Sequence, residues 1–261
     1  MAGKNSTWEH WEKFWDKKQD INQVYSNDDR IYLNLKKITA FKNKKVLEVG
    51  AGSGRDSFQI ADDNATVFVL DYSPKSLEII QQLNSNNKSH IHCIQADAFK
   101  MPIPDNYFDI VFHQGLLEHF RDPLPLLREN HRILKPGGLL LVDVPQRYHF
   151  YTVIKHILIF INKWFAGWET EFSINELKNL MRKAGFKTKG EYGNWMRPSL
   201  FYRMLREALG KIKINLPLYP KGFKVTRKTR DIIRNRFSEK KISYYTYLDI
   251  GVIGQKKELE K

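Results

Sequence analysis

The sequence has 261 residues, of which 42% are hydrophobic and 28% charged, a composition typical of a globular protein with an apolar core. Its single cysteine, Cys93, excludes an intramolecular disulfide and a cysteine-based metal site. The net charge of +14 is uneven, because residues 1–140 are neutral and Arg197–Lys241 alone hold 14 basic and 3 acidic side chains. This basic stretch predicts a surface that faces an anionic partner, with a plain solvated surface as the alternative.

Helices and strands alternate along most of the chain. Trp8, Trp11, Phe14 and Trp15 fall at helical spacing and predict a short amphipathic helix, and a second helix is expected over Asp29 to Ala40. Apolar runs predict strands over residues 44–50, 65–71, 90–97, 107–115 and 139–145, and later over 187–195 and 243–257. Helices are expected after Ser53 and over residues 73–83, 122–138 and 173–186.

Several of these strands are apolar on both faces, which is typical of a parallel sheet covered by helices on both sides. We therefore predict one α/β domain spanning residues 1–261. Within it we expect four parts, namely an N-terminal helical lid, a cofactor-binding core, an amphipathic substrate cover and a basic insertion before the last strand. Their expected bounds are residues 1–40, 45–144, 147–172 and 197–241.

A glycine-rich turn, "VGAGSGRDS", follows the first strand and has the spacing Gly-x-Gly-x-Gly. A dinucleotide fingerprint requires Gly-x-Gly-x-x-Gly, but Arg55 and Ser57 stand at the positions of its last glycine. No Gly-Lys-Ser/Thr follows, so the turn is not a phosphate-binding loop of that type either. The turn predicts close approach of the backbone to a ligand other than a pyrophosphate.

An acidic residue ends the second strand. Asp71 lies 19 positions after Gly52 and precedes Ser73 and Pro74, which are expected to begin the next helix. In open α/β sheets, ligands bind outside the carboxyl ends of the strands, where a carboxylate can accept hydrogen bonds from both hydroxyls of a ribose. The sequence therefore indicates a nucleoside-containing ligand.

Four segments in the expected order resemble the class I S-adenosylmethionine-dependent methyltransferases, and in particular the group that includes ubiquinone and menaquinone biosynthesis methyltransferases (methyltransferase type 11). They are "LEVGAGSG", "QADAF", "FDIVFHQGLLEHF" and "RILKPGGLLLVDVP". The resemblance implies a Rossmann-like, seven-stranded sheet of order 3-2-1-4-5-7-6 with the last strand antiparallel. It implies S-adenosylmethionine as the cofactor and S-adenosylhomocysteine as the product.

The same resemblance implies a cofactor-binding set. The glycine backbone would border the methionine part, Asp71 would bind the ribose, and Asp97 would bind the adenine amino group. The full set is Glu48, Gly50, Ala51, Gly52, Gly54, Asp71, Tyr72, Ser73, Asp97, Ala98, His113 and Gln114.

Methyl transfer is an in-line displacement that needs an aligned nucleophile, and it needs a base only when the acceptor carries a proton. His113, at the end of the fourth strand, and His119 are the candidate catalytic residues, with Glu118 beside them; structural roles are the alternative. Some quinone O-methyltransferases hold a divalent metal with a Glu-x-x-Glu-His cluster at this place. Because Gly115 stands where the first glutamate would be, we expect no metal.

Two segments bear on the acceptor. Phe150, Val153, Ile154, Ile157, Leu158, Ile161, Trp164, Phe165 and Trp168 lie on one helical face, which predicts either ordinary core or a cover over an apolar substrate or membrane surface. With the basic stretch, this favours O- or C-methylation of a small-molecule or lipid-like acceptor with an apolar and an anionic part. An RNA-modifying methyltransferase is the alternative, and a cofactor-binding scaffold without catalysis is a third.

The N-terminal sequence "MAGKNSTWEHWEKFW" lacks the apolar core and cleavage site of a secretory signal. We expect a cytoplasmic protein, with peripheral association at the inner face of the membrane as the variant that the apolar stripe suggests. A nucleic acid is the less favoured partner, and the sequence does not indicate the oligomeric state.

Overall fold

The computed structural model describes residues 29–86, 90–161, 169–220, 232–234, 236–237 and 240–258. It also describes Thr7, Glu9, Trp11, Glu12, Trp15 and Thr229. Predictions that rest on Trp8, Phe14, Trp164, Phe165 and Trp168 lie outside these residues.

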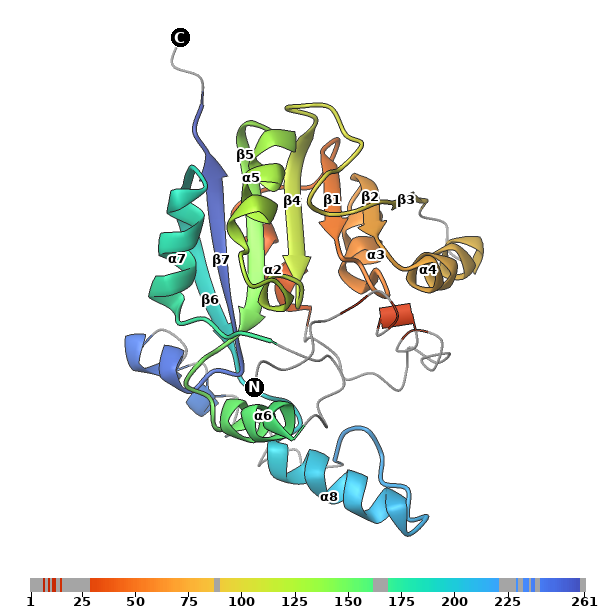
Figure 1. Ribbon diagram of the computed structural model, residues 1–261, viewed down its shortest axis with the longest axis vertical. Helices are drawn as coiled ribbons and strands as arrows, with labels where there is room; N and C mark the ends of the chain where they lie inside the picture. The colour runs from red at the N-terminus through yellow and green to blue at the C-terminus, as the bar shows by residue number, and fades with distance from the viewer. Residues whose placement is uncertain are drawn as a thin grey trace.

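A seven-stranded sheet forms the centre of the protein (Figure 1). Its order is β3-β2-β1-β4-β5-β7-β6, and only β7 runs antiparallel to its neighbours. Both the order and the antiparallel strand confirm the expected fold. The strands are β1 (Lys45–Val49), β2 (Thr66–Asp71), β3 (Ile91–Gln95), β4 (Phe108–Gln114), β5 (Leu134–Pro145), β6 (Phe186–Asn194) and β7 (Asp249–Lys256).

Helices cover both faces of the sheet, as the two-sided apolar strands predicted. One buried cluster joins α2, α3 and α4 to the sheet, and a second joins α5 and α7 to its other face. Two further helices, α6 and α8, follow the carboxyl ends of β5 and β6. The helices are α2 (Arg30–Lys36), α3 (Arg55–Asp62), α4 (Pro74–Asn86), α5 (Leu124–Ile133), α6 (Phe150–Phe160), α7 (Ile174–Lys183) and α8 (Leu200–Lys211), with short 3₁₀ turns at Leu117–His119 and Lys241–Tyr245.

Local signals explain two of the helix starts. Ser73 caps α4, since its Oγ accepts a hydrogen bond from Ser76 N at 3.3 Å, as predicted. Ser173 and Glu176 form a reciprocal capping box at α7.

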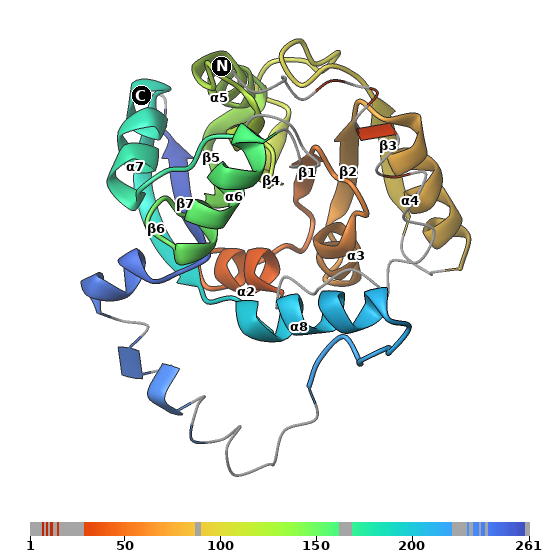
Figure 2. The same cartoon turned by 60° about the horizontal axis from the view of Figure 1, so that its bottom comes forward.

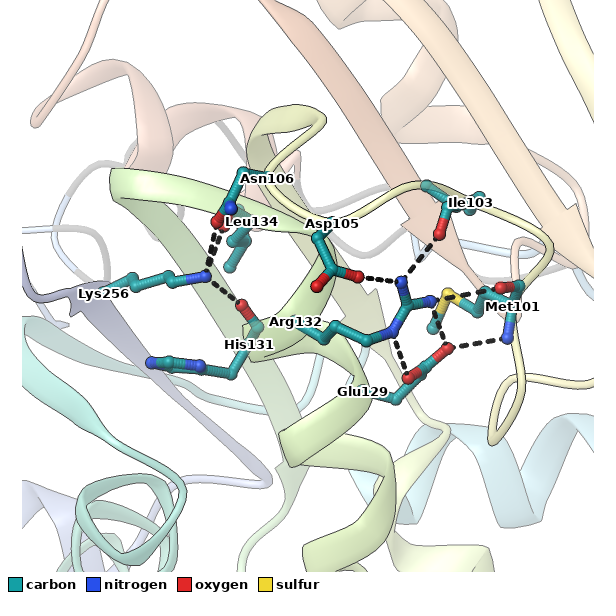
Figure 3. Close-up of polar contacts among 9 residues, drawn as sticks. All are labelled: Met101, Ile103, Asp105, Asn106, Glu129, His131, Arg132, Leu134 and Lys256. Carbon is teal, nitrogen blue, oxygen red and sulfur yellow. Dashed lines mark hydrogen bonds and ion pairs between the residues drawn. The ribbon is translucent and has the colours of Figure 1, made fainter.

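Helix α5 ends earlier than the sequence predicts (Figure 3). The helix was expected to continue to the glycines at 137 and 138, but it ends at Ile133 and β5 begins at the next residue. Lys256, on β7, donates hydrogen bonds of 2.8 Å to the carbonyls of His131 and Leu134 and so satisfies the end of the helix. No local sequence signal reveals a cap that comes from so far along the chain.

Arg132 attaches the same helix to the segment before β4 (Figure 3). Its guanidinium binds both carboxylate oxygens of Glu129, at 2.7 and 2.8 Å, and Asp105 at 2.6 Å, and it donates to the carbonyls of Met101 and Ile103.

The last strand also differs from the prediction, because it begins at Asp249 and residues 241–245 form a 3₁₀ turn.

Candidate functional site

A cavity of about 510 Å³ lies at the carboxyl ends of β1, β2, β3 and β4, within the range of small-molecule sites. The loops that follow these four strands line it, and Thr7, Trp11 and Trp15 of the N-terminal segment complete it. This is the end of a parallel sheet at which ligands of α/β proteins bind.

The glycine turn forms one wall of the cavity. Gly50, Gly52 and Gly54 all adopt left-handed backbone conformations, with φ of 67°, 54° and 64°, which side chains other than glycine rarely accept. A Cβ on Gly52 would lie 2.6 Å from Cζ2 of Trp15, so a side chain at this position would displace that ring. The turn therefore presents bare backbone to the cavity.

Asp71 joins this turn to the start of α4. Its Oδ2 accepts hydrogen bonds of 2.9 Å from Gly52 N and Ser76 Oγ, and its Oδ1 accepts one of 2.9 Å from Ser73 N. Burial raises the pKa of Asp71, and these hydrogen bonds oppose that rise. Asp71 thus holds the glycine turn in place while it borders the cavity.

Glu48 lies beneath the turn. It accepts a hydrogen bond of 2.5 Å from Ser57 Oγ, and burial, together with the nearby charge of Asp56, raises its pKa well above the ordinary value. A protonated carboxyl here can donate as well as accept hydrogen bonds.

Most of the predicted cofactor-binding residues come together at this cavity. Its lining includes Glu48, Gly50, Ala51, Gly52, Asp71, Tyr72, Ser73, Asp97, Ala98 and Gln114. Gly54 does not line it, and instead the turn at Gly54 lies against Ile80 of α4. Asp97 is exposed, and its Oδ1 accepts a hydrogen bond of 2.9 Å from Phe99 N.

The two candidate histidines have different surroundings. His113 is fully buried in β4 and is not part of the cavity lining, and neither ring nitrogen has a hydrogen-bond partner among the described residues. Burial lowers its pKa to about 3. The structure does not bring His113 to the cavity, because side chains alternate along β4 and it is the next residue, Gln114, that faces the cavity.

His119 does line the cavity. Its ring meets the Trp11 ring edge-on at 4.8 Å between centroids, and its Nδ1 lies 4.0 Å from Oε1 of Glu169. Burial lowers the pKa of His119, although the charge of Glu169 opposes this. The neighbouring Glu118 is also buried, and burial and Glu169 raise its pKa well above the ordinary value.

Aromatic side chains form the wall that the sequence analysis did not assign to the site. Phe99 and Phe120 lie edge-to-face at 4.6 Å between centroids, and both line the cavity with Trp11 and Trp15. Two signals in the sequence pointed to this wall, namely the position of Phe99 directly after the predicted adenine contacts and the predicted N-terminal helical lid that contains Trp11 and Trp15. Among the described residues, no cluster of three or more His, Cys, Asp or Glu side chains has the arrangement of a metal site.

The sequence matches a family model described as a methyltransferase domain over residues 47–142, from β1 into β5. This range contains the glycine turn and every predicted cofactor contact. The chain therefore carries a methyltransferase domain over these residues. It is an enzyme, and S-adenosylmethionine is its cofactor.

Curated relatives agree with this methyltransferase assignment. A demethylmenaquinone methyltransferase of Geobacillus sp. is 28% identical over 58% of this chain and 74% of its own length. A ubiquinone biosynthesis O-methyltransferase of Pseudomonas fluorescens is 29% identical over 71% of this chain and 83% of its own length.

A solved structure from Thermotoga maritima, described as a possible histamine N-methyltransferase, superposes with a TM-score of 0.65. It is 21% identical and covers 96% of this methyltransferase chain and 99% of the other. At this level of identity the match supports a shared fold and nothing further.

The cavity fits the cofactor. The loops after the adjacent strands β1, β2 and β3 bring bare glycine backbone, the Asp71 carboxylate and the exposed Asp97 carboxylate to it in that order, which suits an amino acid joined to a nucleoside.

Proposed function

We propose that this methyltransferase acts on a hydroxylated aromatic ring of the quinone type, and that His119 is its catalytic base. The observation that carries the proposal is the cavity itself, which the glycine turn, the aromatic side chains and His119 line together. Flat rings gain from edge-to-face and stacked contacts with Trp and Phe side chains. The names of the curated relatives support the same acceptor class.

The cofactor, when bound, supplies a methyl group on a sulfonium. In our proposal the backbone at Gly50 and Gly52 borders its amino-acid part, Asp71 and Asp97 bind its nucleoside, and Tyr72 and Ala98 flank the base. The aromatic residues exclude water and orient the acceptor ring, which is the main contribution an enzyme makes to a displacement of this kind.

His119 has the properties of a base. Its lowered pKa keeps the imidazole neutral near pH 7, so that it can accept a proton from an acceptor hydroxyl. Glu169 lies 4.0 Å from Nδ1 and would stabilise the imidazolium that forms. A hydroxyl acceptor leads directly to O-methylation, and the phenolate formed from it is also the activated species for transfer to ring carbon.

The test is turnover with a short-chain hydroquinone, measured by mass spectrometry as methylated product and S-adenosylhomocysteine. We expect His119→Asn to lower turnover by roughly 100-fold, with cofactor affinity unchanged. His113→Asn is the matched control, because His113 is buried and does not line the cavity. Any loss of turnover in this variant should equal its loss of folded protein.

Full turnover in His119→Asn would contradict the role of His119. Methylation of RNA, with none of the hydroquinone, would contradict the acceptor class.

A further inference from the structure

Helix α6 is inverted relative to an ordinary surface helix, with its charge inside and its apolar residues outside. Lys155 is 2% exposed, and its Nζ lies 2.8 Å from Glu169 Oε2 and 2.5 Å from Glu171 Oε1. Five large apolar side chains of the helix and its C-cap are exposed, and Phe150 and Phe160 reach 68% and 79%. The exposed set is Phe150, Val153, Ile157, Phe160 and Ile161.

The spacing of this set places it on one face of α6, since its members follow the i, i+3, i+7 rule. The sequence left open whether the apolar stripe is core or cover. Its most exposed members contact little of the protein, so the stripe is not ordinary core.

Helix α8 also exposes apolar side chains, and it adds positive charge. None of its residues is buried, and Phe201 is 76% exposed. Met204, Leu205 and Ile212 are exposed on the same helix and at its end. Lys211 and Lys213 are exposed beside them, and residues 197–220 hold five basic side chains and one acidic.

The two helices adjoin at one end of the protein. The charges of Arg203 and Glu207, both on α8, act on the pKa of Tyr151 on α6. Figure 1 shows α6 and α8 beyond the carboxyl ends of the parallel strands, and Figure 2 shows both at the end that comes forward. The cavity lies at this same end of the sheet.

We propose that the exposed faces of α6 and α8 form a surface that docks on an anionic phospholipid bilayer. Large exposed apolar patches on soluble proteins mark binding sites. Helices that lie in a membrane interface bury an apolar face to about 5–10 Å and attract anionic lipids through Lys and Arg. Among the described residues no helix is long and apolar enough to cross a bilayer, so the interaction proposed is with its surface.

The chemistry of the surface favours a bilayer over other partners. Phosphates of RNA would pair with Lys211 and Lys213 but would leave the aliphatic side chains of Val153, Ile157 and Ile212 in water. A second copy of this chain would cover the apolar residues but would bring two basic surfaces together, which is unfavourable. An anionic bilayer satisfies both the apolar and the basic side chains.

The docking surface does not depend on the proposed reaction, because vesicle binding is measured without cofactor or acceptor. The full chain is sedimented with vesicles of phosphatidylcholine and phosphatidylglycerol in a 70:30 ratio, and with phosphatidylcholine alone. We expect binding to the anionic vesicles and much weaker binding to the neutral ones.

Two double variants separate the apolar and basic contributions. Phe150→Ser/Phe160→Ser should lower affinity by at least roughly 100-fold, because two aromatic side chains no longer enter the bilayer. Lys211→Gln/Lys213→Gln should lower affinity for anionic vesicles by roughly 30-fold and leave neutral vesicles unaffected. Ile38→Ser, which removes a partly exposed apolar side chain that lies beside Gly190 of β6 and belongs to neither α6 nor α8, is the control and should bind as the parent does.

Unchanged vesicle binding in Phe150→Ser/Phe160→Ser, with its melting temperature retained, would overturn the proposal. So would a concentration-dependent dimer that the same variant abolishes, since α6 would then be an interface between copies. Tight RNA binding lost only in the lysine variant, with no vesicle binding by the parent, would assign the surface to nucleic acid instead.

Discussion

The glycine turn and helix α6 lie at the same end of the sheet, but they are built in opposite ways. The turn is held by buried hydrogen bonds that Asp71 accepts from Gly52, Ser73 and Ser76, and its glycines leave bare backbone at the cavity. Helix α6 is held by the buried charges of Lys155, Glu169 and Glu171, and it presents large side chains to solvent. The conformation of the glycine turn depends on its backbone, whereas the orientation of α6 depends on which of its side chains form buried ion pairs.

The largest effect on stability should come from breaking the ion pairs beneath α6. Burial opposes the charge of Lys155, but Glu169 and Glu171 outweigh it and raise its pKa. Lys155→Met leaves two buried carboxylates without their cation and should cost about 3–5 kcal/mol of unfolding free energy, measured by urea denaturation.

Lys178→Met is the matched control, because the Lys178–Glu191 pair is about one-third exposed and should contribute about 0–1 kcal/mol. Equal losses in the two variants would show that α6 is not anchored by its buried charges.

An intermediate effect is expected from His113, as a function of pH. Its pKa is about 3 in the folded protein and about 6.5 when exposed, so the unfolded chain binds a proton that the folded chain rejects. This lowers stability as pH falls from about 6.5 towards 3, by about 1.4 kcal/mol per pH unit.

His113→Leu should remove that component, so that the difference in unfolding free energy between variant and parent grows as pH falls from 6.5 to 4.5. Denaturation at three pH values measures it. If the unfolding free energies of the variant and the parent change equally with pH, His113 is solvated or charged in the folded state.

The smallest effect on stability should come from the exposed face of α6. Phe160→Ser removes a side chain that is 79% exposed and should change the unfolding free energy by less than about 0.5 kcal/mol. Phe112→Ala, in the centre of β4, should cost about 3–5 kcal/mol by comparison. A large loss from Phe160→Ser in a thermal melt would show that this face packs against the protein.

The sequence predicted the glycine turn far better than helix α6. The alternation of predicted strands and helices and the spacing from Gly52 to Asp71 can both be read from short stretches of the sequence. A parallel sheet and the glycine-turn side of the cavity could therefore be predicted from them. The inversion of α6 could not, since an isolated lysine in an apolar stripe is expected to face solvent. Lys155 faces inward because Glu169 and Glu171, more than a dozen residues later, are buried with it.

The same limit applies elsewhere. The end of α5 depends on Lys256, from the last strand, and the aromatic wall depends on Trp11 and Trp15, which only the fold brings to the glycine turn. His113 and Gln114 differ by one position, and which of them faces the cavity depends on the register of β4.

The central claim is that bare backbone at the glycine turn binds S-adenosylmethionine, and calorimetric titration with S-adenosylhomocysteine tests it most directly. The parent should bind one equivalent. Gly52→Ala should weaken binding by roughly 100-fold or more, since a methyl group there has left-handed strain of about 1–2 kcal/mol and lies within 2.6 Å of Trp15. Gly210→Ala, in α8 with open space around it, should bind as the parent does. Equal affinity in Gly52→Ala and Gly210→Ala, or NAD bound as tightly as S-adenosylhomocysteine, would contradict the account.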